Sequence, residues 1–467
     1  MTSFATVILA AGEGKRMKSR TPKVLHTVCG KPMVSLVWEA ARKVGHDPII
    51  TVVRDASSAI VGTLDNSCEY AFQAEPLGTG DALLCARDAA GDFDNILVMN
   101  GDIPLVQPGT LIELTEVHLR SEAPVTMLTA TVDEPDGLGR VVRDSSGLVR
   151  AVVERSEADA ETLSLTEINA GVYCFRADWL WDNLARVQAS TSGEIFLTHL
   201  IGMAADSGYD VATHRASDPT EALGVNTRAE LASAESVMRK RIRERWMLSG
   251  VSMPDPQSVY IDCDVVIGAD TVVLPNTHIR GGTRIGVECE IGPNSIIEHS
   301  SIGDRVLVVA SVVEESTLES NVDVGPFSHI RPDTYLEAGV HIGNFAEVKN
   351  SRIGQGTKSG HFSYIGDAQV GSNVNIGAGS VTCNFDGERK HQTVIGNDAF
   401  IGCDTMMVAP VTIGDRSYTS AGSVINRSVP PDSGAIGAPA RIRRRRVEES
   451  DTESSSSRPA GPPTSEH

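Results

Sequence analysis

The sequence contains no hydrophobic run as long as a membrane span, so no transmembrane helix is predicted. Its opening stretch, MTSFATVILAAG, has no basic residue ahead of the apolar run, and that run ends in glycine instead of a cleavage site. We therefore expect this stretch to form the first buried strand of a cytoplasmic protein that has no membrane partner.

The sequence also lacks paired cysteines. Its eight cysteines are scattered, and none forms a C-x-x-C pair. This pattern argues against a zinc site and against a disulfide framework, and it suits a reducing compartment.

Basic residues are in short supply, with 41 Lys and Arg against 61 Asp and Glu and a formal net charge of −20. Because a nucleic-acid-binding surface needs a basic footprint, nucleic acid is not an expected partner. The one basic cluster, RIRRRR at 441–446, is followed by VEESDTE. Any anionic substrate must therefore be bound by local lysines and arginines against an unfavourable overall field.

The sequence divides into regions of different composition. Residues 1–227 alternate short β-rich runs with helical stretches, which favours a mostly parallel α/β sheet. Residues 228–249 are charged, free of Gly and Pro, and apolar at helical spacing, so they predict a connecting helix. Residues 250–446 carry a repeat. Residues 447–467 are rich in Ser, Pro and acid with little to bury, and we expect a disordered tail there.

The repeat in the third region consists of apolar residues at every sixth position. They stand at 261, 267, 273, 279, 285, 291 and 297, again from Val324 to Val348, and again from Ile395 to Ile413. Helices and plain strands do not have this period, whereas a three-sided parallel β-coil has one inward aliphatic side chain per face. The sequence therefore predicts a β-coil of hexapeptide repeats.

A glycine-rich turn follows the first predicted strand, in LAAGEGKRMKSRTPKVLH at 9–26. Gly12 and Gly14 would let backbone N–H groups approach phosphate oxygens, and Arg16 and Lys23 add positive charge. The turn fits neither a Walker A loop nor a dinucleotide fingerprint, because the closing G-K-[ST] and the third glycine are absent. Ligands bind at the carboxyl ends of strands in open α/β sheets, so this position favours a binding site over a structural turn.

These residues resemble the signature of the sugar-1-phosphate nucleotidyltransferases, L-A-A-G-x-G-x-R-M followed by P-K. The strings QAEPLGTGDAL (73–83), NGDIPL (100–105) and EINAGVY (167–173) match three further segments of that family. The roles that the resemblance implies are phosphate contact by Lys23, uracil recognition by Gln73, Gly78 and Thr79, Mg²⁺ binding by Asp102 and Asn226, and sugar contact by Gly139, Glu154 and Asn169. The rest of the implied nucleotide and sugar-phosphate site is Leu9, Ala10, Ala11, Gly12, Gly14, Arg16, Asn100 and Gly101.

The sequence departs from that family pattern at three positions. Lys15 stands where threonine is usual, and Pro76 and Asp81 replace a usual glutamine and histidine. Lys15 adds charge near phosphate, and the other two bear on fine substrate contacts. Attack by a sugar phosphate on the α-phosphorus of a nucleoside triphosphate needs no general base, because the nucleophile is already an anion.

Two cations are predicted to lie together on the coil. Three faces of six residues make a turn of eighteen, so Ile330 and Val348 lie one above the other. The residues after them, Arg331 and Lys349, then point outward from the same edge. Like charges this close favour an anion between them, so the pair predicts a phosphate site.

The same column continues to Thr382 and brings Tyr364 and His361 close to the two cations. The string TCNFDGERKHQT then inserts about seven residues, including Asn384 and Lys390. Insertions in such arrays project as loops and often build binding sites. A histidine at a coil corner is more often only structural, but beside two cations, a tyrosine and a projecting loop we favour a functional role.

A second resemblance concerns the coil, which is similar to the acetyltransferase half of the bifunctional N-acetylglucosamine-1-phosphate uridyltransferase / glucosamine-1-phosphate acetyltransferase family. The matching strings are GPFSHIRP, HIGNFAEVKN, GHFSYIGD, NVNIGAGSVTCNFDG and VAPVTIG. With the N-terminal motifs, the resemblance spans nearly all of residues 5–425. It implies that His361 is a general base, since imidazole titrates near neutral pH and can take a proton from the attacking sugar amine.

The resemblance implies two further sets of residues in the coil. Glucosamine 1-phosphate is held by Arg331, Lys349, Tyr364, Asn375 and Lys390, and acetyl-CoA is contacted by Ala378, Asn384, Phe385, Cys403 and Ala421. Phe385 and Cys403 replace a common tyrosine and serine and so remove two hydroxyl groups. The family's basic residue near the end of the coil does not align with Arg441.

The two resemblances together imply an α/β nucleotidyltransferase domain with a Rossmann-like mixed sheet, followed by a left-handed parallel β-helix. The implied enzyme acetylates glucosamine 1-phosphate with acetyl-CoA, then transfers uridylyl from UTP to N-acetylglucosamine 1-phosphate and releases pyrophosphate, for bacterial cell-wall synthesis. A homotrimer with acetyltransferase sites between subunits is also implied. Two alternatives stay open. One is a single-activity nucleotidyltransferase whose β-helix only assembles or regulates the oligomer, and the other is a non-catalytic assembly subunit that keeps both folds.

Overall fold

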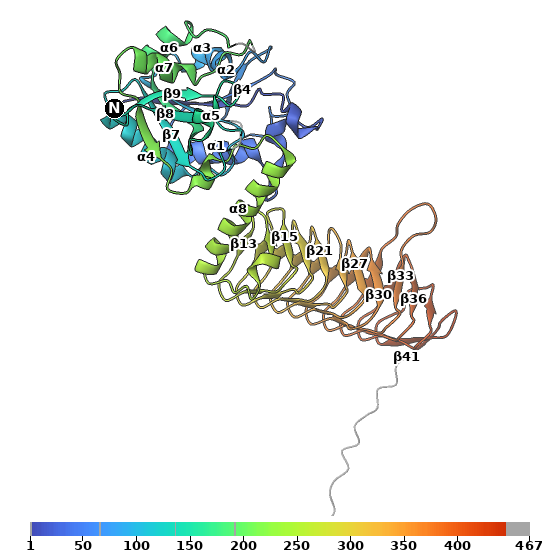
Figure 1. Cartoon of the computed structure of the whole chain (residues 1–467). Helices are drawn as coiled ribbons and strands as arrows, with labels where there is room; N and C mark the ends of the chain where they lie inside the picture. The colour runs from blue at the N-terminus through green and yellow to red at the C-terminus, as the bar shows by residue number, and fades with distance from the viewer. Residues whose placement is uncertain (1, 65–66, 136, 191–192, 445–467) are drawn as a thin grey trace, which may run out of the picture. The chain divides into compact units, whose positions relative to one another are not determined.

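The structure is a computed structural model that describes residues 2–64, 67–135, 137–190 and 193–444. The predicted tail at 447–467 lies outside these residues. Contacts divide the described residues into two compact units (Figure 1). The first holds the chain up to Gly250 together with Asp255–Val265 and Ile279–Gly282, and the second holds the remainder.

A nine-stranded mixed sheet lies at the centre of the first unit. Its order is β11-β7-β10-β6-β1-β4-β5, with β8 paired to β10 and β9 paired to β8. The strands are β1 (Phe4–Leu9), β4 (Ile49–Val53), β5 (Glu69–Phe72), β6 (Asn95–Asn100), β7 (Val125–Thr131), β8 (Arg140–Arg143), β9 (Val149–Val153), β10 (Glu167–Arg176) and β11 (Ala212–Arg215). β6, β1, β4 and β5 are parallel, whereas β10 runs antiparallel to β6 and β7. The predicted Rossmann-like mixed sheet is confirmed.

Helices pack on both faces of this sheet. α1 (Met33–Val44) and α4 (Pro108–Arg120) share a core with Ile8 and Leu97. α2 (Thr79–Cys85), α6 (Ala177–Leu184) and α7 (His199–Asp206) share another core with Val7 and Val98. Successive strand residues point to opposite faces, so a strand covered on both sides is largely apolar, as FATVIL is apart from the buried Thr6.

The segment predicted to be a connecting helix forms α8 (Arg228–Leu248). The Thr227 hydroxyl accepts from the Glu230 N–H at 3.2 Å, and the Glu230 carboxylate accepts from the Thr227 N–H at 2.7 Å. This capping box satisfies two donors at the helix end. The same carboxylate accepts from the Asn226 N–H at 2.7 Å, which fixes the residue ahead of the helix. None of the helices in the described part of the chain combines the length and hydropathy of a membrane span.

The second unit is a parallel β-helix with three faces. Its short strands belong to three sheets, and each turn of the coil adds one strand to each sheet. Ile330 pairs with Val348, which pairs in turn with Ile365, and all three side chains are buried. The predicted inward column and the β-helix of hexapeptide repeats are confirmed.

The length of a turn varies along the β-helix. Ile296 pairs with Val312, sixteen residues later. Elsewhere His329 pairs with Glu347, eighteen residues later. Shorter turns lose residues at the corners, so the strands keep their register. Corners are often formed by residues in the left-handed region, such as Asn276 with a φ of 58°, a conformation that asparagine adopts more readily than most residues.

One turn contains the predicted insertion. Val381 pairs with Met406, twenty-five residues later, which is seven more than in an eighteen-residue turn. The extra residues project as a loop beside β33 (Val381–Cys383) and β36 (Met406–Val408) in Figure 1. Within the loop, Phe385 and Lys390 form an antiparallel bridge.

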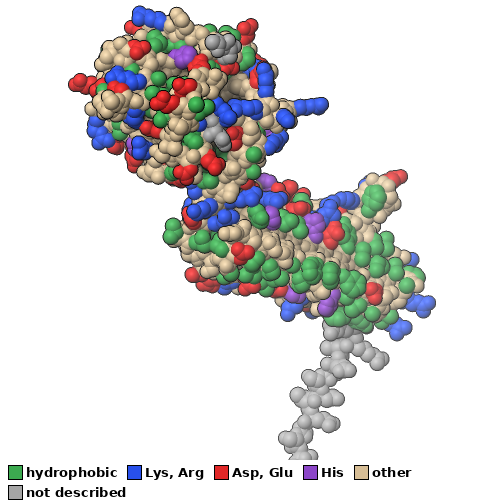
Figure 2. All heavy atoms as spheres, in the orientation of Figure 1, with side chains coloured by type: hydrophobic (Ala, Val, Ile, Leu, Met, Phe, Trp, Pro, Cys, Tyr) green, Lys and Arg blue, Asp and Glu red, His purple; other side chains and the backbone are tan. Residues whose placement is uncertain are grey.

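Hydrophobic side chains also gather on the outside of the β-helix (Figure 2). Exposed large hydrophobic residues of this unit include Phe327, Phe345 and Phe362. The rings of Phe327 and Phe345 stack with centroids 5.4 Å apart. Exposed apolar side chains that cluster in this way are typical of an interaction surface.

Candidate active sites

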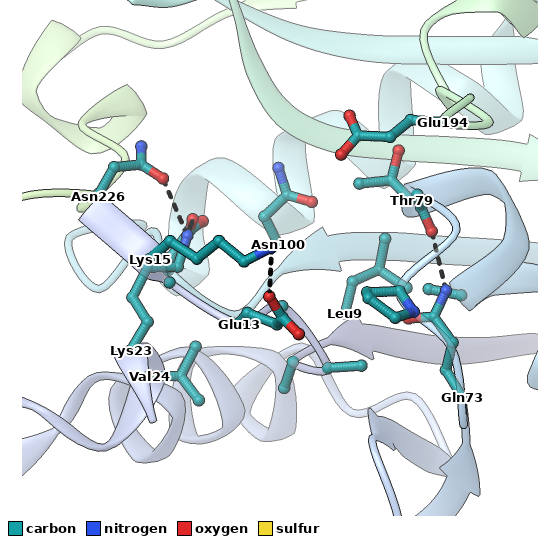
Figure 3. A pocket seen from close by; sticks show the side chains of 18 of the residues that line it. Leu9, Glu13, Lys15, Lys23, Val24, Gln73, Thr79, Asn100, Glu194 and Asn226 are labelled. Carbon is teal, nitrogen blue, oxygen red and sulfur yellow. Dashed lines mark hydrogen bonds and ion pairs between the residues drawn. The ribbon is translucent and has the colours of Figure 1, made fainter. Parts of the chain in front are cut away.

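The first candidate site is a cleft of about 440 Å³ at the carboxyl ends of β1, β5 and β6 (Figure 3). The strand order changes direction between β1 and β6, where Leu9 pairs with Asn100. Ligands of open α/β sheets bind at such a switch point. The predicted residues that line the cleft are Leu9, Ala10, Ala11, Gly12, Gly14, Arg16, Lys23, Gln73, Gly78, Thr79, Asn100, Asp102 and Asn226.

The glycine-rich turn passes closely over Lys23. Gly14 has a φ of 64°, and a Cβ there would lie 2.5 Å from the Lys23 Cβ. A side chain at this position would be strained by its backbone and would clash, so glycine is required. At Gly12 nothing lies within 4 Å of an added Cβ, which leaves the backbone open toward the cleft.

Lys23 joins the two predicted magnesium ligands. Its ammonium donates to the Asp102 carboxylate and, at 2.9 Å, to the Asn226 side-chain oxygen. The side chains of Lys23 and Asp102 are 13% and 17% exposed, so this ion pair is largely shielded from water. Two side-chain oxygens from distant parts of the chain therefore accept hydrogen bonds from one cation.

Of the predicted uracil-reading residues, Gly78 and Thr79 lie at the start of α2, and Gln73 directly follows β5. The Gln73 side-chain amide donates to the Gly78 carbonyl at 3.1 Å and to the Asp81 carboxylate at 2.7 Å. The Thr79 hydroxyl accepts from the Leu197 N–H at 3.0 Å. A Cβ on Gly78, whose φ is 112°, would lie 2.5 Å from the Ile195 carbonyl, so this turn is held tightly against the 195–197 segment.

The predicted sugar-contacting residues form a second group, just before β8, just after β9 and on β10. The Asn169 N–H donates to the Gly139 carbonyl at 2.9 Å, and the Asn169 side chain donates to the Tyr173 hydroxyl at 2.6 Å. Glu154 accepts from the Thr198 hydroxyl at 3.2 Å, and burial raises the pKa of its carboxyl group.

This second group adjoins the first through Asn100. A Cβ on Gly171, two residues after Asn169, would lie 2.3 Å from the Asn100 side-chain nitrogen. Gly101, the remaining predicted residue, donates its N–H to the Leu9 carbonyl at 2.9 Å. The predicted nucleotide and sugar residues are thus neighbours at one edge of the sheet.

Sequence reasoning missed Glu13, Glu194 and Phe196, which also line the cleft. Glu13 lies inside the recognised motif and could have been found there. Glu194 and Phe196 carry no motif, and their segment reaches the cleft through a backbone bond from the Ile195 N–H to the Leu77 carbonyl at 2.8 Å. Only the folded chain reveals that contact.

The second candidate site is a groove of about 620 Å³ on one face of the β-helix. His361 lies there, between β29 (Lys358–Ser359) and β30 (Ser363–Gly366). Its carbonyl accepts from the buried Ser363 hydroxyl at 2.7 Å, so its backbone is held while its side chain stays exposed. The other predicted residues that line the groove are Asn375, Ala378, Cys403 and Ala421.

Sequence reasoning missed His341 and Lys358 in this groove. His341 pairs with Lys358, and Lys358 pairs with Asn375, on successive turns. Stepping back one turn at a time from Asn375 would have found both. The His341 imidazole forms a hydrogen bond with the Asp323 carboxylate, one turn further back.

The remaining predicted residues lie on another sheet of the same β-helix. Arg331 follows β24 (His329–Ile330), and Lys349 ends β27 (Ala346–Lys349). Contact with the Lys390 ammonium and repulsion by Arg331 lower the pKa of Lys349, so three cations lie together. The predicted column thus brings its two cations to one edge, and the loop adds Lys390.

Tyr364 and Asn384 border these cations. The Asn384 side chain donates to the Tyr364 hydroxyl at 3.4 Å and to the Asp367 carboxylate at 2.5 Å. Phe385 is exposed beside them in the loop. Within one chain the predicted acetyltransferase residues therefore form two groups, one in the groove and one around the cations.

Comparisons with known proteins identify the family. Residues 6–203 match the MobA-like NTP transferase domain, and residues 264–299 and 392–427 match the bacterial transferase hexapeptide (six repeats). The chain is 44% identical over 451 residues to "Bifunctional protein GlmU" of Pelobacter propionicus, which covers 95% of this chain and 98% of that protein. The chain belongs to the GlmU family of bifunctional proteins.

Other members are similarly close. The GlmU protein of Exiguobacterium sibiricum is 46% identical over 438 residues, covering 93% of this chain and 97% of that protein. That of Halalkalibacterium halodurans is 44% identical over 438 residues, with 93% and 96% covered. The family inferred from the motifs is confirmed, and with it the prediction of a bifunctional transferase that combines nucleotidyltransferase and acyltransferase halves.

Proposed function

We propose that this chain makes UDP-N-acetylglucosamine in two consecutive transfers. Residues 250–446 acetylate glucosamine 1-phosphate with acetyl-CoA. Residues 1–227, joined to them through 228–249, then react N-acetylglucosamine 1-phosphate with UTP and release pyrophosphate. The observation that carries the uridylyl step is the convergence of Asp102, Asn226 and Lys23 beside a glycine-rich turn at the switch point of the sheet.

In the uridylyl step the protein positions two anions and neutralises charge. The glycine-rich turn and Arg16 bind the triphosphate, Gln73 and Thr79 orient the base, and Asn169 and Glu154 orient the sugar. An oxygen of the sugar phosphate forms a bond to the α-phosphorus, the α–β phosphoanhydride bond breaks, and its electron pair leaves with pyrophosphate. No side chain needs to take a proton.

The residues around Lys23 fit Mg²⁺. A carboxylate and a side-chain amide oxygen are donors that this ion takes, and they already converge on one positive group. Among the described residues, no group of three or more His, Cys, Asp and Glu side chains could hold a metal, so the remaining ligands would be phosphate oxygens and water. When bound, Mg²⁺ supplies further neutralisation of the triphosphate charge.

In the acetyl step His361 accepts a proton from the sugar amine as the nitrogen attacks the thioester carbonyl, and the coenzyme thiolate leaves. Arg331, Lys349 and Lys390 bind the sugar phosphate. Because one chain presents the cations and the His361 groove separately, we propose that groups from different copies complete each site in a homotrimer. The hexapeptide repeats and the exposed phenylalanines support this assembly.

The test is incubation with acetyl-CoA, glucosamine 1-phosphate, UTP and Mg²⁺, following free thiol and pyrophosphate separately. Asp102→Ala should abolish pyrophosphate release while thiol release continues. His361→Ala should lower acetyl transfer by about 10²–10⁴-fold and should release pyrophosphate normally when N-acetylglucosamine 1-phosphate is supplied directly. Normal acetyl transfer by His361→Ala would contradict the proposed base. A wild-type chain that releases pyrophosphate from N-acetylglucosamine 1-phosphate but never thiol would support the single-activity alternative, and one that releases neither product would support the non-catalytic alternative.

A further inference from the structure

An acidic side chain lies in the cleft that must accept a triphosphate. Glu13 belongs to the glycine-rich turn and lines the cleft. Its carboxylate pairs with the Lys15 ammonium at 2.8 Å and with the Arg54 guanidinium at 3.0 Å. The hydrogen bonds from Lys15 and Arg54 lower the pKa of Glu13, so it stays ionised at neutral pH. Such a charge would repel phosphate unless its two partners compensate it.

Lys15 is positioned so that an anion in the cleft can replace Glu13 as its partner. It begins the 3-10 turn η1 (Lys15–Met17), directly after the left-handed Gly14. Its side chain is 85% exposed, and within the described residues its one ion pair is with Glu13. In Figure 3 the Lys15 side chain extends over the cleft to reach Glu13. An exposed ion pair of this kind contributes little stability, so a more highly charged anion can displace Glu13.

The other cations in or beside the cleft are less available to bind phosphate. Lys23 is engaged by Asp102 and Asn226. Arg54, which directly follows β4, pairs with Glu13 but is not among the residues that line the cleft. Of the lysines and arginines that line the cleft, Lys15 and Arg16 therefore remain for the outer phosphates.

We propose that Lys15 binds the β- and γ-phosphates of the nucleotide and then the pyrophosphate formed from them, and that Glu13 competes with pyrophosphate for Lys15 and Arg54. This inference rests on the proposed uridylyl transfer and adds a way in which the protein favours dissociation of its product, pyrophosphate. When the α–β bond breaks, the leaving pyrophosphate gains charge and is held more tightly by nearby cations. Glu13 offers those cations an alternative anion two residues from Lys15, which favours dissociation of the product.

The test compares Lys15→Gln, Glu13→Gln and the control Lys18→Gln, which removes an exposed lysine just beyond the same turn. Pyrophosphate is measured as a product inhibitor of the forward reaction and as a substrate of the reverse reaction. Lys15→Gln should raise both the inhibition constant and the KM for pyrophosphate by about fivefold, and Glu13→Gln should lower both by about threefold. KM for N-acetylglucosamine 1-phosphate should change by less than about twofold in each variant, because Lys15 does not contact the sugar.

The double variant separates competition from distortion of the turn. In Lys15→Gln with Glu13→Gln, pyrophosphate should bind nearly as weakly as in Lys15→Gln alone, because without Lys15 the removal of the Glu13 carboxylate frees only Arg54. An unchanged KM for N-acetylglucosamine 1-phosphate reports that the first unit of each variant is folded, and acetyl transfer reports the same for the second unit. Unchanged pyrophosphate constants in Lys15→Gln, or an equal change in the sugar-phosphate KM, would overturn the inference. A wild-type chain without uridylyl transfer would instead overturn the proposed function itself.

Discussion

The ammonium groups of Lys349 and Lys390 lie against each other on the outside of the β-helix, although they are far apart in the chain. Their contact lowers the pKa of Lys349, and Arg331 adds to the repulsion. Arg331 is compensated by its ion pair with Glu347 at 2.5 Å, but the two lysines repel each other in an empty site and would be favourable around a phosphate dianion. Repulsion between these side chains does not stabilise the folded state, so we interpret the arrangement as an anion-binding site.

The cation cluster gives the first prediction. Lys390→Gln should raise KM for glucosamine 1-phosphate by about tenfold, because it removes a charge-assisted hydrogen bond to phosphate, and uridylyl transfer should not change. The matched control is Arg389→Gln, which removes a positive charge from the neighbouring position of the loop. Steady-state kinetics of acetyl transfer check this, and equal effects of the two substitutions would count against a specific phosphate site.

The cluster also predicts a pH dependence. Because its neighbours lower the pKa of Lys349, this group loses its proton at a lower pH than an ordinary lysine. Binding of glucosamine 1-phosphate should therefore weaken as the pH rises through the alkaline range. In Lys390→Gln the repulsion is reduced, so that weakening should move to higher pH. A KM profile with the same alkaline limb in both proteins would argue against contact between these lysines.

The close approach of Gly14 to Lys23 gives a prediction for the uridylyl site. Gly14→Ala should lower uridylyl transfer by about tenfold or more, since the new methyl group must push Lys23 away from Asp102 and Asn226. Gly45→Ala is the control, because Gly45 also has a positive φ, of 88°, but nothing lies within 4 Å of its added Cβ. That variant should lose about 1 kcal/mol of stability and keep its activity.

Buried His118 predicts how the first unit responds to acid. Its ring nitrogens bond to the Thr126 hydroxyl at 2.9 Å and to the Asn95 side chain at 3.1 Å. Burial, aided by Arg176, lowers the pKa of His118 to about 4 from 6.5. Below pH 6.5 the unfolded chain binds a proton that the folded chain does not, so the free energy of unfolding should fall between pH 6.5 and 4. The loss should approach about 3 kcal/mol at the lower end.

The measurement is chemical denaturation of the full chain at a series of pH values, with the first unit followed by uridylyl activity. His118→Gln should have a shallower slope over this range than the wild type. His299→Gln serves as the control, because the His299 side chain is 58% exposed. Parallel slopes for His118→Gln and the wild type would show that other groups govern acid unfolding.

The inward column of the β-helix gives the last prediction. Thr382 is buried, and its hydroxyl accepts from the Gly366 N–H at 2.7 Å and donates to the Gly366 carbonyl at 3.0 Å. Thr382→Val leaves that N–H unpaired and should destabilise the second unit by about 1–3 kcal/mol. Thr412→Val, at an exposed position, should change stability little. Loss of acetyltransferase activity on heating compares the two, and similar inactivation temperatures would contradict the assigned role of the Thr382 hydroxyl.

Much of the β-helix could be predicted because its period is written directly in the sequence. The stacking of Ile330 on Val348 follows from counting, and it places Arg331 and Lys349 correctly. Counting also gives the seventeen-residue turn from Val348 to Ile365, with one residue lost before Ile353. The sixteen-residue turns, such as the one from Ile296 to Val312, could not be counted in this way. They lose residues at corners, where no inward side chain marks the change.

The uridylyl cleft depended on motif resemblance, since spacing could not bring its parts together. Lys23 and Asp102 are 79 residues apart, and Lys23 and Asn226 are 203 apart. Their meeting depends on the order of strands in the sheet, which local pattern does not specify. Glu194 shows the limit of both approaches, because it carries no motif and reaches the cleft only through the backbone contact of its neighbour Ile195.

The seven-residue insertion after Val381 leaves the ladder on either side undisturbed, since Ala368 and Val370 still pair with Thr393 and Ile395 on the next turn. A corner of this β-helix therefore tolerates an inserted loop without loss of strand pairing. Loops of other lengths and charges could be exchanged there while the neighbouring rungs keep their partners. The residues that a β-helix presents for binding or catalysis at its corners can therefore change without any change in how the β-helix itself folds.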